Sequence, residues 1–383
     1  MEICASKLYI LRVGYHEFTE FTNFTNLGVD SHDTIQYMMT RRLPAEWEAQ
    51  SAIQFTFPHE DSDWAAMLDE VIPCFARIIE TVTRFQKALV VCKNREKTAL
   101  ILRGCVQENL ILVELPSNDT WARDHGGITV LEDGERVILD FMFTGWGLKF
   151  PADKDNLITE NLYKKGIFKV KRLEKTGLVL EGGGIESDGK GTLLTTSECL
   201  LSPNRNPHLS KRQLENRLKK LFGVQRILWL NHGYLAGDDT DSHIDTLARL
   251  CDENTIAYIK CDDTKDEHYE ALKAMENELK AFRFMANGVE EGSGKPYKLV
   301  PLPMADACFD EEGQRLPATY ANFLIINGAV LVPTYNVPQD AEALEILRGC
   351  FPDREVIGLD CRPLIWQHGS LHCISMQYPV GVV

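Results

Sequence analysis

The chain has 383 residues, of which 44% are hydrophobic, and its 41 Lys and Arg against 56 Asp and Glu give a net charge of −15. That apolar fraction can bury the core of one large domain or two, which excludes a wholly disordered protein. A charge this negative repels phosphate groups and anionic lipids, and no uncharged apolar stretch approaches the roughly 18 residues of a membrane span. We therefore expect no nucleic-acid or membrane partner, and small cations as the favoured ligands.

The 11 cysteines are scattered along the chain, and no two have the C-x-x-C spacing. This pattern predicts reduced, mostly buried thiols rather than a disulfide framework or a zinc site. Near the N-terminus the only apolar run is residues 8–11, between Lys7 and Arg12, which is too short for a secretory signal. Both features predict a cytoplasmic protein.

Residues 1–37 differ from the rest of the chain, because they hold a Phe/Thr/Asn-rich run at 18–26 and no sustained helical period. We expect a poorly packed extension there. Met38 and Met39 stand just before the first well-patterned sequence, which fits a start codon assigned too early. Residues 38–383 are predicted to form a single domain.

The first patterned elements are a strand and a long helix. From Ala52 apolar and polar residues alternate as in a strand, which Pro58 ends. Residues 61–82 then repeat apolar side chains at three-and-four spacing, with Pro73 as a kink. Three later helices are predicted at residues 210–222, stopped by Gly223; 264–285, opened by a Thr264/Glu267 capping box; and 339–347.

Five Gly- and Asp-rich stretches, about 50 to 80 residues apart, each follow a short apolar strand, with helices interleaved. They are residues 118–127, 180–184, 237–245, 320–322 and 368–373. Such spacing is typical of a repeated supersecondary unit, and a radial arrangement of repeats would bring every stretch to one axis. The alternative is an ordinary α/β sheet whose elements are separated by Gly-rich turns.

His243 and Asp245 are two residues apart, so on an extended chain both side chains point the same way, which favours a site carried by a strand. Asp238, Asp239 and Asp241 precede them, and four carboxylates within eight positions suit a cation site. A histidine with a purely structural role is the alternative.

Cys373 lies in a Gly/Ser-flanked segment near the C-terminus. If that segment is a strand, His372 points away from Cys373 and is not its base. A reactive thiol needs an electropositive partner or a bound cationic substrate that lowers its pKa, whereas a buried inert thiol is the alternative. We expect the other cysteines to be inert.

An aromatic ring, a cation and a carboxylate occur within four residues, at Trp121, Arg123 and Asp124. This group stands just before Gly126 and Gly127. We interpret Arg123 as a structural ion-pair partner. Glu181 has a similar position, because it precedes three glycines.

Two other kinds of site are rejected. Residues 184–190 imitate the start of a phosphate-binding loop, but Gly191 stands where Ser or Thr is required, and Glu186 and Asp188 would repel phosphate. A metal bound by His243, Asp245 and Cys373 has no support from paired ligand spacing. We expect no metal and no organic cofactor.

Taken together, these stretches resemble the agmatine deiminase branch of the guanidino-group-modifying enzymes, over residues from about 43 to 379. The resemblance is carried, in the family's order, by LPAEWE (43–48), WARD (121–124), LEGGG (180–184), DSHID (241–245), NFLIINGAV (322–330), FPDR (351–354) and HCIS (372–375). It implies an α/β fold, the five-bladed pseudo-symmetric α/β-propeller called the pentein fold.

The resemblance also implies a catalytic set. Asp124 and Asp245 would hold the substrate guanidinium near Cys373, which attacks as a thiolate. His243 would protonate the departing ammonia and then activate water. Asn322 and Asn327 lie in a matching motif without an assigned role.

For substrate binding, the resemblance places Glu181 in the site and packs Trp121 against the substrate. Asp239, or its neighbour Asp238 or Asp241, would meet the distal amine of agmatine. No arginine occurs between Val137 and Lys171, where peptidyl-arginine deiminases are expected to bind a carboxylate.

The resemblance thus favours hydrolysis of agmatine, a small cationic guanidine, to N-carbamoylputrescine and ammonia in polyamine biosynthesis. The chain departs from the family's usual pattern at Ser242, where glycine is frequent, and at residues 367–371, where a triple glycine is frequent. These departures affect recognition of the substrate's tail rather than the chemistry. Deimination of peptidyl-arginine or another guanidine, and an inactive polyamine-binding propeller, are the alternatives. A homo-oligomer is left open.

Overall fold

A computed structural model of the chain describes residues 40–284 and 294–383, which fall in one compact unit, Met39–Val383. The extension expected at residues 1–37 lies outside the described residues. Among the helices of the described ranges, none is long and apolar enough to cross a lipid bilayer.

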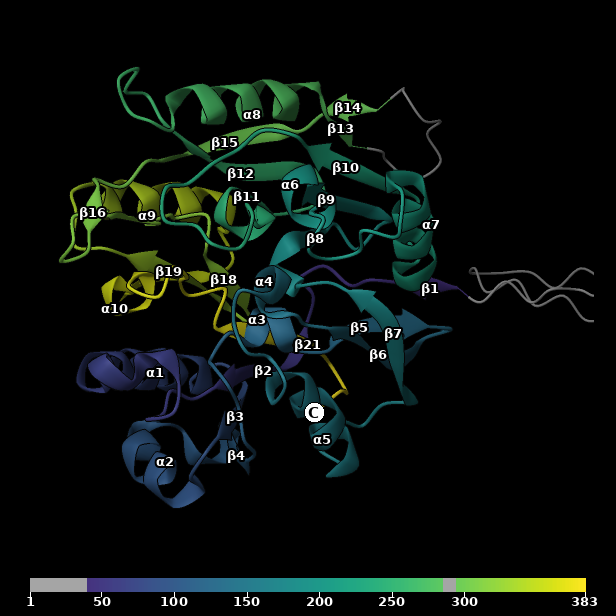
Figure 1. Cartoon of the computed structure of the whole chain (residues 1–383), viewed down its shortest axis with the longest axis vertical. Coiled ribbons are helices and arrows are strands. Elements are labelled where there is room, and N and C mark those ends of the chain that lie inside the picture. The colour runs from purple at the N-terminus through teal and green to yellow at the C-terminus, as the bar shows by residue number, and fades with distance from the viewer. Residues whose placement is uncertain (1–39, 285–293) are drawn as a thin grey trace, which may run out of the picture. The chain divides into compact units, whose positions relative to one another are not determined.

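The described residues form an α/β fold with five sheets of three or four strands each (Figure 1). One four-stranded sheet has the strand order β21 (Ser375–Pro379), β2 (Gln50–Thr56), β3 (Lys87–Cys92), β4 (Leu110–Glu114). The other has the order β1 (Arg41–Arg42), β5 (Ile128–Glu132), β6 (Glu135–Met142), β7 (Arg172–Val179). The three-stranded sheets are β10 (Arg226–Leu230), β9 (Thr192–Thr196), β8 (Ile185–Ser187); β11 (Ala248–Leu250), β12 (Thr255–Lys260), β15 (Lys298–Pro303); and β18 (Leu324–Ile326), β19 (Ala329–Thr334), β20 (Glu355–Asp360). Two small ribbons pair β13 (Arg283–Phe284) with β14 (Lys295–Pro296), and β16 (Cys308–Phe309) with β17 (Arg315–Leu316).

The longer helices connect parallel strands within these sheets. They are α1 (Leu68–Thr83), α2 (Arg95–Ile101), α5 (Ile158–Lys164), α7 (Lys211–Phe222), α8 (Tyr269–Ala281) and α9 (Gln339–Cys350). The short helices are α3 (Ala122–His125), α4 (Gly145–Leu148), α6 (Ser197–Leu200) and α10 (Arg362–Ile365), with 3₁₀ turns η1 (Asp63–Met67), η2 (Leu102–Gly104), η3 (Gln107–Asn109), η4 (Asp155–Leu157), η5 (Gly182–Gly184) and η6 (Ile244–Thr246).

One connection recurs in all five of these sheets. A strand pairs antiparallel with the next strand, and a helical crossover then leads to a parallel strand beside it. In the sheet that contains β2, the antiparallel partner is the C-terminal strand β21, and α1 leads from β2 to β3. The chain therefore repeats one supersecondary unit rather than building a single continuous sheet.

Local sequence accounts for the predicted helices that the structure contains. The 61–82 helix is observed as η1 followed by α1, with Pro73 inside α1. Helix α7 begins after Ser210, whose hydroxyl accepts from the backbone N–H of Gln213 in a capping box, and ends at the left-handed Gly223. The helix predicted at 339–347 is α9, which continues to Cys350.

The helix predicted from Thr264 is wrong at its start, because α8 begins only at Tyr269. The carboxylates of Asp263 and Asp266 accept hydrogen bonds from the backbone N–H groups of Lys265 and His268, each two residues on. Such local bonds favour turns over a helix. The helix ends at Ala281, before residues that pair with β14, and its predicted end, Met285, lies outside the described residues.

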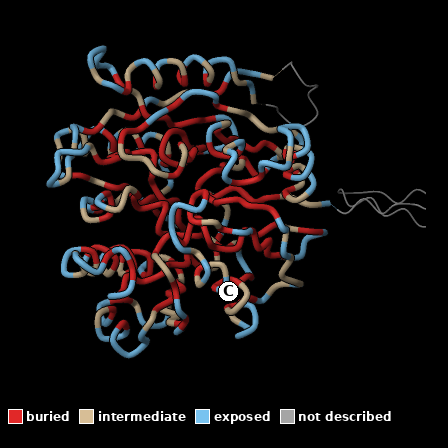
Figure 2. Tube along the Cα trace, in the orientation of Figure 1, coloured by how far each residue is buried: buried red, intermediate tan, exposed pale blue. Residues whose placement is uncertain are grey.

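The strands and the inward faces of the helices form the buried interior, while the outer faces of the helices are exposed (Figure 2). The largest hydrophobic cluster includes β3, β18 and β19, and it reaches Trp121, Trp146 and Cys373. The candidate site residues thus lie on short turns that rest directly on the core.

Candidate active site

The residues predicted to carry chemistry lie on turns and short helices rather than on strands, so the prediction of a strand-borne site is wrong. His243 precedes η6 and Asp245 lies within it, because Asp241 and Ser242 take positive φ values of 65° and 59° and turn the chain. Cys373 is in a turn just before β21. Strand alternation therefore does not set the directions of these side chains.

Tertiary packing nevertheless brings several of these turns to one cavity, whose empty space together with the solvent at its mouth is about 370 Å³. Its lining consists of Asp63, Asp119, Trp121, Asp124, Trp146, Phe150, Asp239, Thr240, Gln367, His368, Gly369 and Cys373. Four of the predicted site residues are in this lining, namely Trp121, Asp124, Asp239 and Cys373. The other three, Glu181, His243 and Asp245, are buried next to it, and their contacts are described below.

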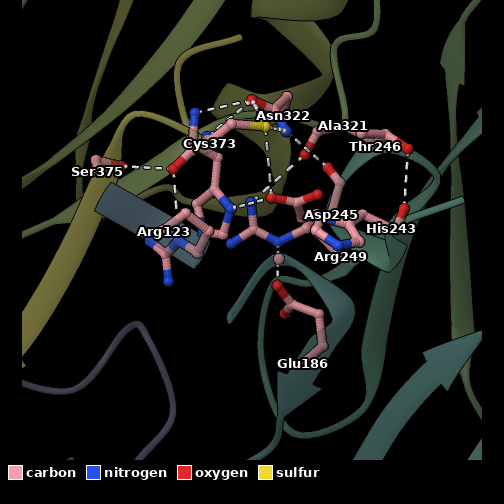
Figure 3. A network of polar contacts seen from close by, with 12 residues as sticks. Arg123, Glu186, His243, Asp245, Thr246, Arg249, Ala321, Asn322, Cys373 and Ser375 are labelled. Atoms are coloured by element: carbon pink, nitrogen blue, oxygen red, sulfur yellow. Dashed lines mark hydrogen bonds and ion pairs between the residues drawn. The ribbon is translucent and has the colours of Figure 1, made fainter. Parts of the chain in front are cut away.

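The Cys373 sulfur is nearly enclosed, with 4% of the residue exposed. Asn322 Nδ2 donates to Sγ at 3.2 Å, and Asp245 Oδ2 lies 3.8 Å from Sγ (Figure 3). Burial raises the pKa of the Cys373 thiol well above its usual value, and the carboxylates of Asp245 and Asp124 add to this effect. The resting sulfur is therefore a thiol, which a cation bound between the two carboxylates would help to ionise.

His243 is completely buried between two acids. Its Nδ1 lies 3.7 Å from Asp124 Oδ1, and its Nε2 lies 3.9 Å from Glu181 Oε2. Burial by itself lowers the pKa of His243, but the charge of Asp124 and the contact with Cys199 outweigh it and raise the pKa well above the ordinary value. The imidazole is therefore protonated and can act as a proton donor.

The two aspartates near the sulfur have different partners. Asp124 accepts from the backbone N–H of Gly183 at 3.1 Å and from the indole N–H of Trp146 at 3.0 Å, and burial raises its pKa to about 6. Asp245 Oδ2 pairs with His372 Nδ1 at 2.7 Å, while Asp245 Oδ1 is buried without a hydrogen-bond partner. Burial would raise the pKa of Asp245, but the bond with His372 outweighs it and lowers the pKa. An unpaired carboxylate oxygen of this kind suits a cationic ligand.

Glu181 contacts the histidine rather than the cavity. Arg205 Nε donates to Glu181 Oε2 at 2.7 Å, and the same guanidinium donates to the carbonyl of Thr240 at 2.8 Å and to Asp241 at 2.5 Å. Arg205 thus ties the turn before η5 to the turn before η6. Glu181 Oε2 therefore lies near His243 without a hydrogen bond, and both ring nitrogens of His243 are buried without a hydrogen-bond partner.

The acidic run before His243 divides into three structural roles. Asp238 accepts from the hydroxyl of Thr240 and the backbone N–H of Ser242, which closes the turn. Asp241 pairs with Arg205 and with Lys149, the latter at 2.8 Å. Asp239 lines the cavity, and burial raises its pKa. Of these three aspartates, Asp239 is therefore the one placed to meet a ligand.

Trp146 is a site residue that the sequence analysis missed. Its indole ring lies 6.3 Å from that of Trp121, edge to face, and forms part of the cavity wall. It lies in a turn where Gly145, Trp146, Gly147 and Leu148 all have positive φ. A tryptophan between two glycines was the available signal, because glycine accommodates that backbone.

The segment just before Cys373 makes a close contact that the sequence did not predict. Gly369 lies so close to Trp121 that a Cβ on it would be 2.1 Å from the indole ring.

Arg123, predicted as a structural ion-pair partner, is buried with its Nη2 4.0 Å from Glu46 Oε2 and its Nη1 2.6 Å from Gln377 Oε1. That prediction for Arg123 agrees with its contacts.

Two groups of side chains among the described residues have the donor types of a metal site. They are Glu181, Cys199 and His243, and Glu46, Glu186 and His372. Each group already has a buried arginine in ion pairs with its carboxylates, Arg205 in the first and Arg249 in the second. Because a guanidinium repels a second cation at this range, we assign neither group to a metal.

The sequence matches the Porphyromonas-type peptidyl-arginine deiminase family over residues 42–379. A solved Porphyromonas gingivalis structure, provisionally named an arginine deiminase, is 55% identical with a TM-score of 0.84 over 90% of this chain and 99% of its own. A C. jejuni agmatine deiminase with substrate bound is 38% identical with a TM-score of 0.83, over 90% and 98%. The agmatine deiminase of Medicago truncatula is 32% identical over 88% of this chain and 96% of its own length. The chain is a member of the Porphyromonas-type peptidyl-arginine deiminase family.

Proposed function

We propose that this protein is an agmatine deiminase, a hydrolase that converts agmatine to N-carbamoylputrescine and ammonia in polyamine biosynthesis. The observation that carries the proposal is the buried thiol of Cys373 beside two carboxylates and the protonated His243, at a single cavity. The agmatine deiminases among its relatives support this choice of substrate.

The guanidinium of agmatine binds between Asp124 and the unpaired Oδ1 of Asp245, in charge-assisted hydrogen bonds. Its positive charge offsets the two carboxylates that hold the pKa of Cys373 high, so the sulfur loses its proton to solvent on binding. The thiolate then attacks the guanidinium carbon and forms a neutral tetrahedral adduct.

His243 supplies the proton for the first leaving group. It protonates one amino group of the adduct, ammonia departs, and a thiouronium cation remains on Cys373. The neutral imidazole, which lies near Glu181, then takes a proton from water as the oxygen attacks the same carbon. The hydroxyl proton then passes to the departing sulfur as the C–S bond breaks, which releases N-carbamoylputrescine and restores the thiol of Cys373 and the imidazolium of His243.

The distal end of the substrate meets an acidic cavity. Four aspartates line it (Asp63, Asp119, Asp124 and Asp239), whereas its lining includes no lysine or arginine. With Asp124 on the guanidinium, Asp239 binds the distal amine and Trp121 packs on the alkyl chain. A carboxylate at that end, as in arginine, would be repelled, which favours agmatine over free arginine and peptides.

The repeated units suit a five-bladed α/β-propeller in which all five turns meet at one axis. We also propose that residues 38–383 are the catalytic domain and that the protein acts in the cytoplasm.

Deletion of residues 2–37 should leave the turnover of agmatine within twofold of that of the full chain. A larger loss would assign the extension a role in the site.

Ammonia release from agmatine, free arginine and a peptide ending in arginine tests the proposed substrate. We expect turnover of agmatine and less than about 1% of that kcat/KM for the other two, because an unpaired carboxylate facing Asp239 costs more than about 3 kcal/mol. Turnover of arginine or the peptide without turnover of agmatine would overturn the assignment.

Cys373→Ser tests the nucleophile. We expect a loss of at least about 1,000-fold in kcat with an unchanged melting temperature, because a hydroxyl in this acidic site does not ionise. Cys308→Ser, at a half-buried thiol outside the cavity, is the matched control and should keep normal activity. Treatment with a haloacetamidine followed by mass spectrometry distinguishes an enzyme from an inactive polyamine-binding protein. An enzyme should carry a covalent adduct on Cys373, whereas a binding protein should remain unmodified.

A further inference from the structure

One wall of the cavity is a strained segment, residues 144–150, which we call the strap. Trp146 and Phe150 of the strap line the cavity. All four residues 145–148 have positive φ, from 54° to 89°, and Leu148 among them is 81% exposed. Left-handed φ values are unfavourable for side chains larger than glycine, and the exposed Leu148 contributes little packing. Contacts from neighbouring segments must therefore hold this backbone in place.

Lys149 makes such a contact, because it links the strap to the turn that carries Asp239. Its ammonium group donates to the main-chain carbonyl of Asp239 and to Asp241 Oδ1, the latter at 2.8 Å. The other oxygen of Asp241 accepts from Arg205 Nη1 at 2.5 Å, so Asp241 joins two cations. The Lys149 side chain is 35% exposed and is not part of the cavity lining. Lys149 thus lies outside the cavity and connects two segments of its wall.

The bond to the main chain matters because of how Asp239 is supported. Within the described residues, no group donates a hydrogen bond to the Asp239 carboxylate, which lines the cavity. The following carbonyl, that of Thr240, accepts from Arg205 Nη2 at 2.8 Å. Lys149 and Arg205 therefore hold two successive peptide groups of the turn, and the direction of the Asp239 carboxylate depends on the first of them.

We infer that Lys149 is a positioning residue that ties the strap to the 237–242 turn and so directs the Asp239 carboxylate at the distal amine of the substrate. The effect on the amine rests on the proposed function, whereas the tie between strap and turn does not. By its charge alone, an ammonium group near this end of the cavity would repel a dication. Positioning and charge therefore act on substrate binding in opposite directions.

Lys149→Met tests the inference, because methionine keeps an unbranched side chain and removes the donors. We expect KM for agmatine to rise about 10-fold, since a charged hydrogen bond from Asp239 is weakened, while kcat stays within about twofold. The inhibition constant of butylguanidine against agmatine should stay within about twofold, because this compound lacks the distal amine. If Lys149 acted only through its charge, the substitution would lower the KM for agmatine.

Two further variants serve as controls. Lys149→Arg keeps the charge and several donors, so most of the rise in KM should be absent. Lys93 has the same exposed fraction, 35%, and also binds two acceptors, on Glu60 and Asp61, but away from the cavity. Lys93→Met should therefore change neither constant.

Hydrogen exchange tests the tie between strap and turn without any substrate. The amides of residues 144–150 should exchange at least about 10-fold faster in Lys149→Met than in the wild type, because the strained backbone loses an anchor. Lys93→Met should leave their exchange unchanged.

Unchanged exchange in Lys149→Met would refute the tie, whatever substrate the enzyme accepts. Faster exchange with an unchanged or lower KM for agmatine would refute the positioning of Asp239. If the wild type releases no ammonia from agmatine, the proposed function fails, and hydrogen exchange still decides whether Lys149 anchors the strap.

Discussion

At the scale of single residues, Trp146 shows how backbone strain serves the site. Its φ of 54° is in the left-handed region, which costs a non-glycine residue on the order of 1 kcal/mol or more. The turn aims the indole N–H at Asp124 Oδ2, 3.0 Å away, while the ring packs edge to face on Trp121 and Phe143. The strain is offset because one side chain both walls the cavity and fixes a carboxylate.

Trp146→Phe should keep the aromatic wall and remove only this donor. A hydrogen bond to a charged group contributes about 1.5–3 kcal/mol, so we expect kcat/KM for agmatine to fall about 10- to 100-fold. Trp229→Phe is the matched control, because its indole also donates to a carboxylate, Glu215, at 2.8 Å, but outside the cavity. Steady-state kinetics of both variants measure the effect, and equal activity of the two would contradict the role of Trp146.

At the scale of elements, the end of α7 illustrates how one glycine is required by both conformation and space. Gly223 ends the helix with φ of 68°, and a Cβ there would lie 1.9 Å from the carbonyl oxygen of Arg41 in β1. Gly166 follows α5 with nearly the same φ, 69°, but no heavy atom lies within 4 Å of its Cβ position. The two positions therefore separate backbone strain from steric clash.

Gly223→Ala should destabilise the protein more than Gly166→Ala. We expect a loss of about 1 kcal/mol at Gly166 from the left-handed backbone alone, and about 3 kcal/mol or more at Gly223, where β1 must also shift. Denaturant unfolding at 25 °C, followed by circular dichroism, measures both. Losses of equal size would mean that β1 yields without cost.

At the scale of the whole molecule, the position of the acidic residues matters as well as the net charge of −15. Four aspartates line the cavity, so part of this negative charge lies where it can attract a cationic substrate. A dication such as agmatine should gain more from this attraction than a monocation of the same shape.

Salt should therefore lower kcat/KM for agmatine more steeply than for butylguanidine, which lacks the distal amine. Between 0.01 and 0.1 M KCl the screening length falls from about 30 to about 10 Å, and we expect the logarithmic slope for agmatine to be about twice that for the monocation. Sucrose at matched osmolality is the control for non-ionic effects. Equal slopes would show that the bulk charge does not guide the substrate.

The sequence alone determined the elements with strong local causes, and through the family resemblance it proposed most of the candidate site residues. The capping box at Ser210, the left-handed Gly223 and the apolar period of 61–82 are local features, so α7, η1 and α1 were predictable. Motif order proposed Cys373 and two aspartates that the structure places near its sulfur. The start of α8 was not predictable, because competing side-chain bonds in the 263–268 turn replaced the expected cap.

Only the tertiary structure decided how those residues meet. The indole of Trp146 on Asp124, and His372 between Asp245 and Glu46, join residues from 22 to 326 positions apart. No local period encodes such contacts, because they depend on which turns the packed sheets bring together. The protonation of Cys373 and His243 follows from the same packing, since burial and neighbouring charges set it. The sequence thus names the chemical groups, and the fold gives each its charge and direction.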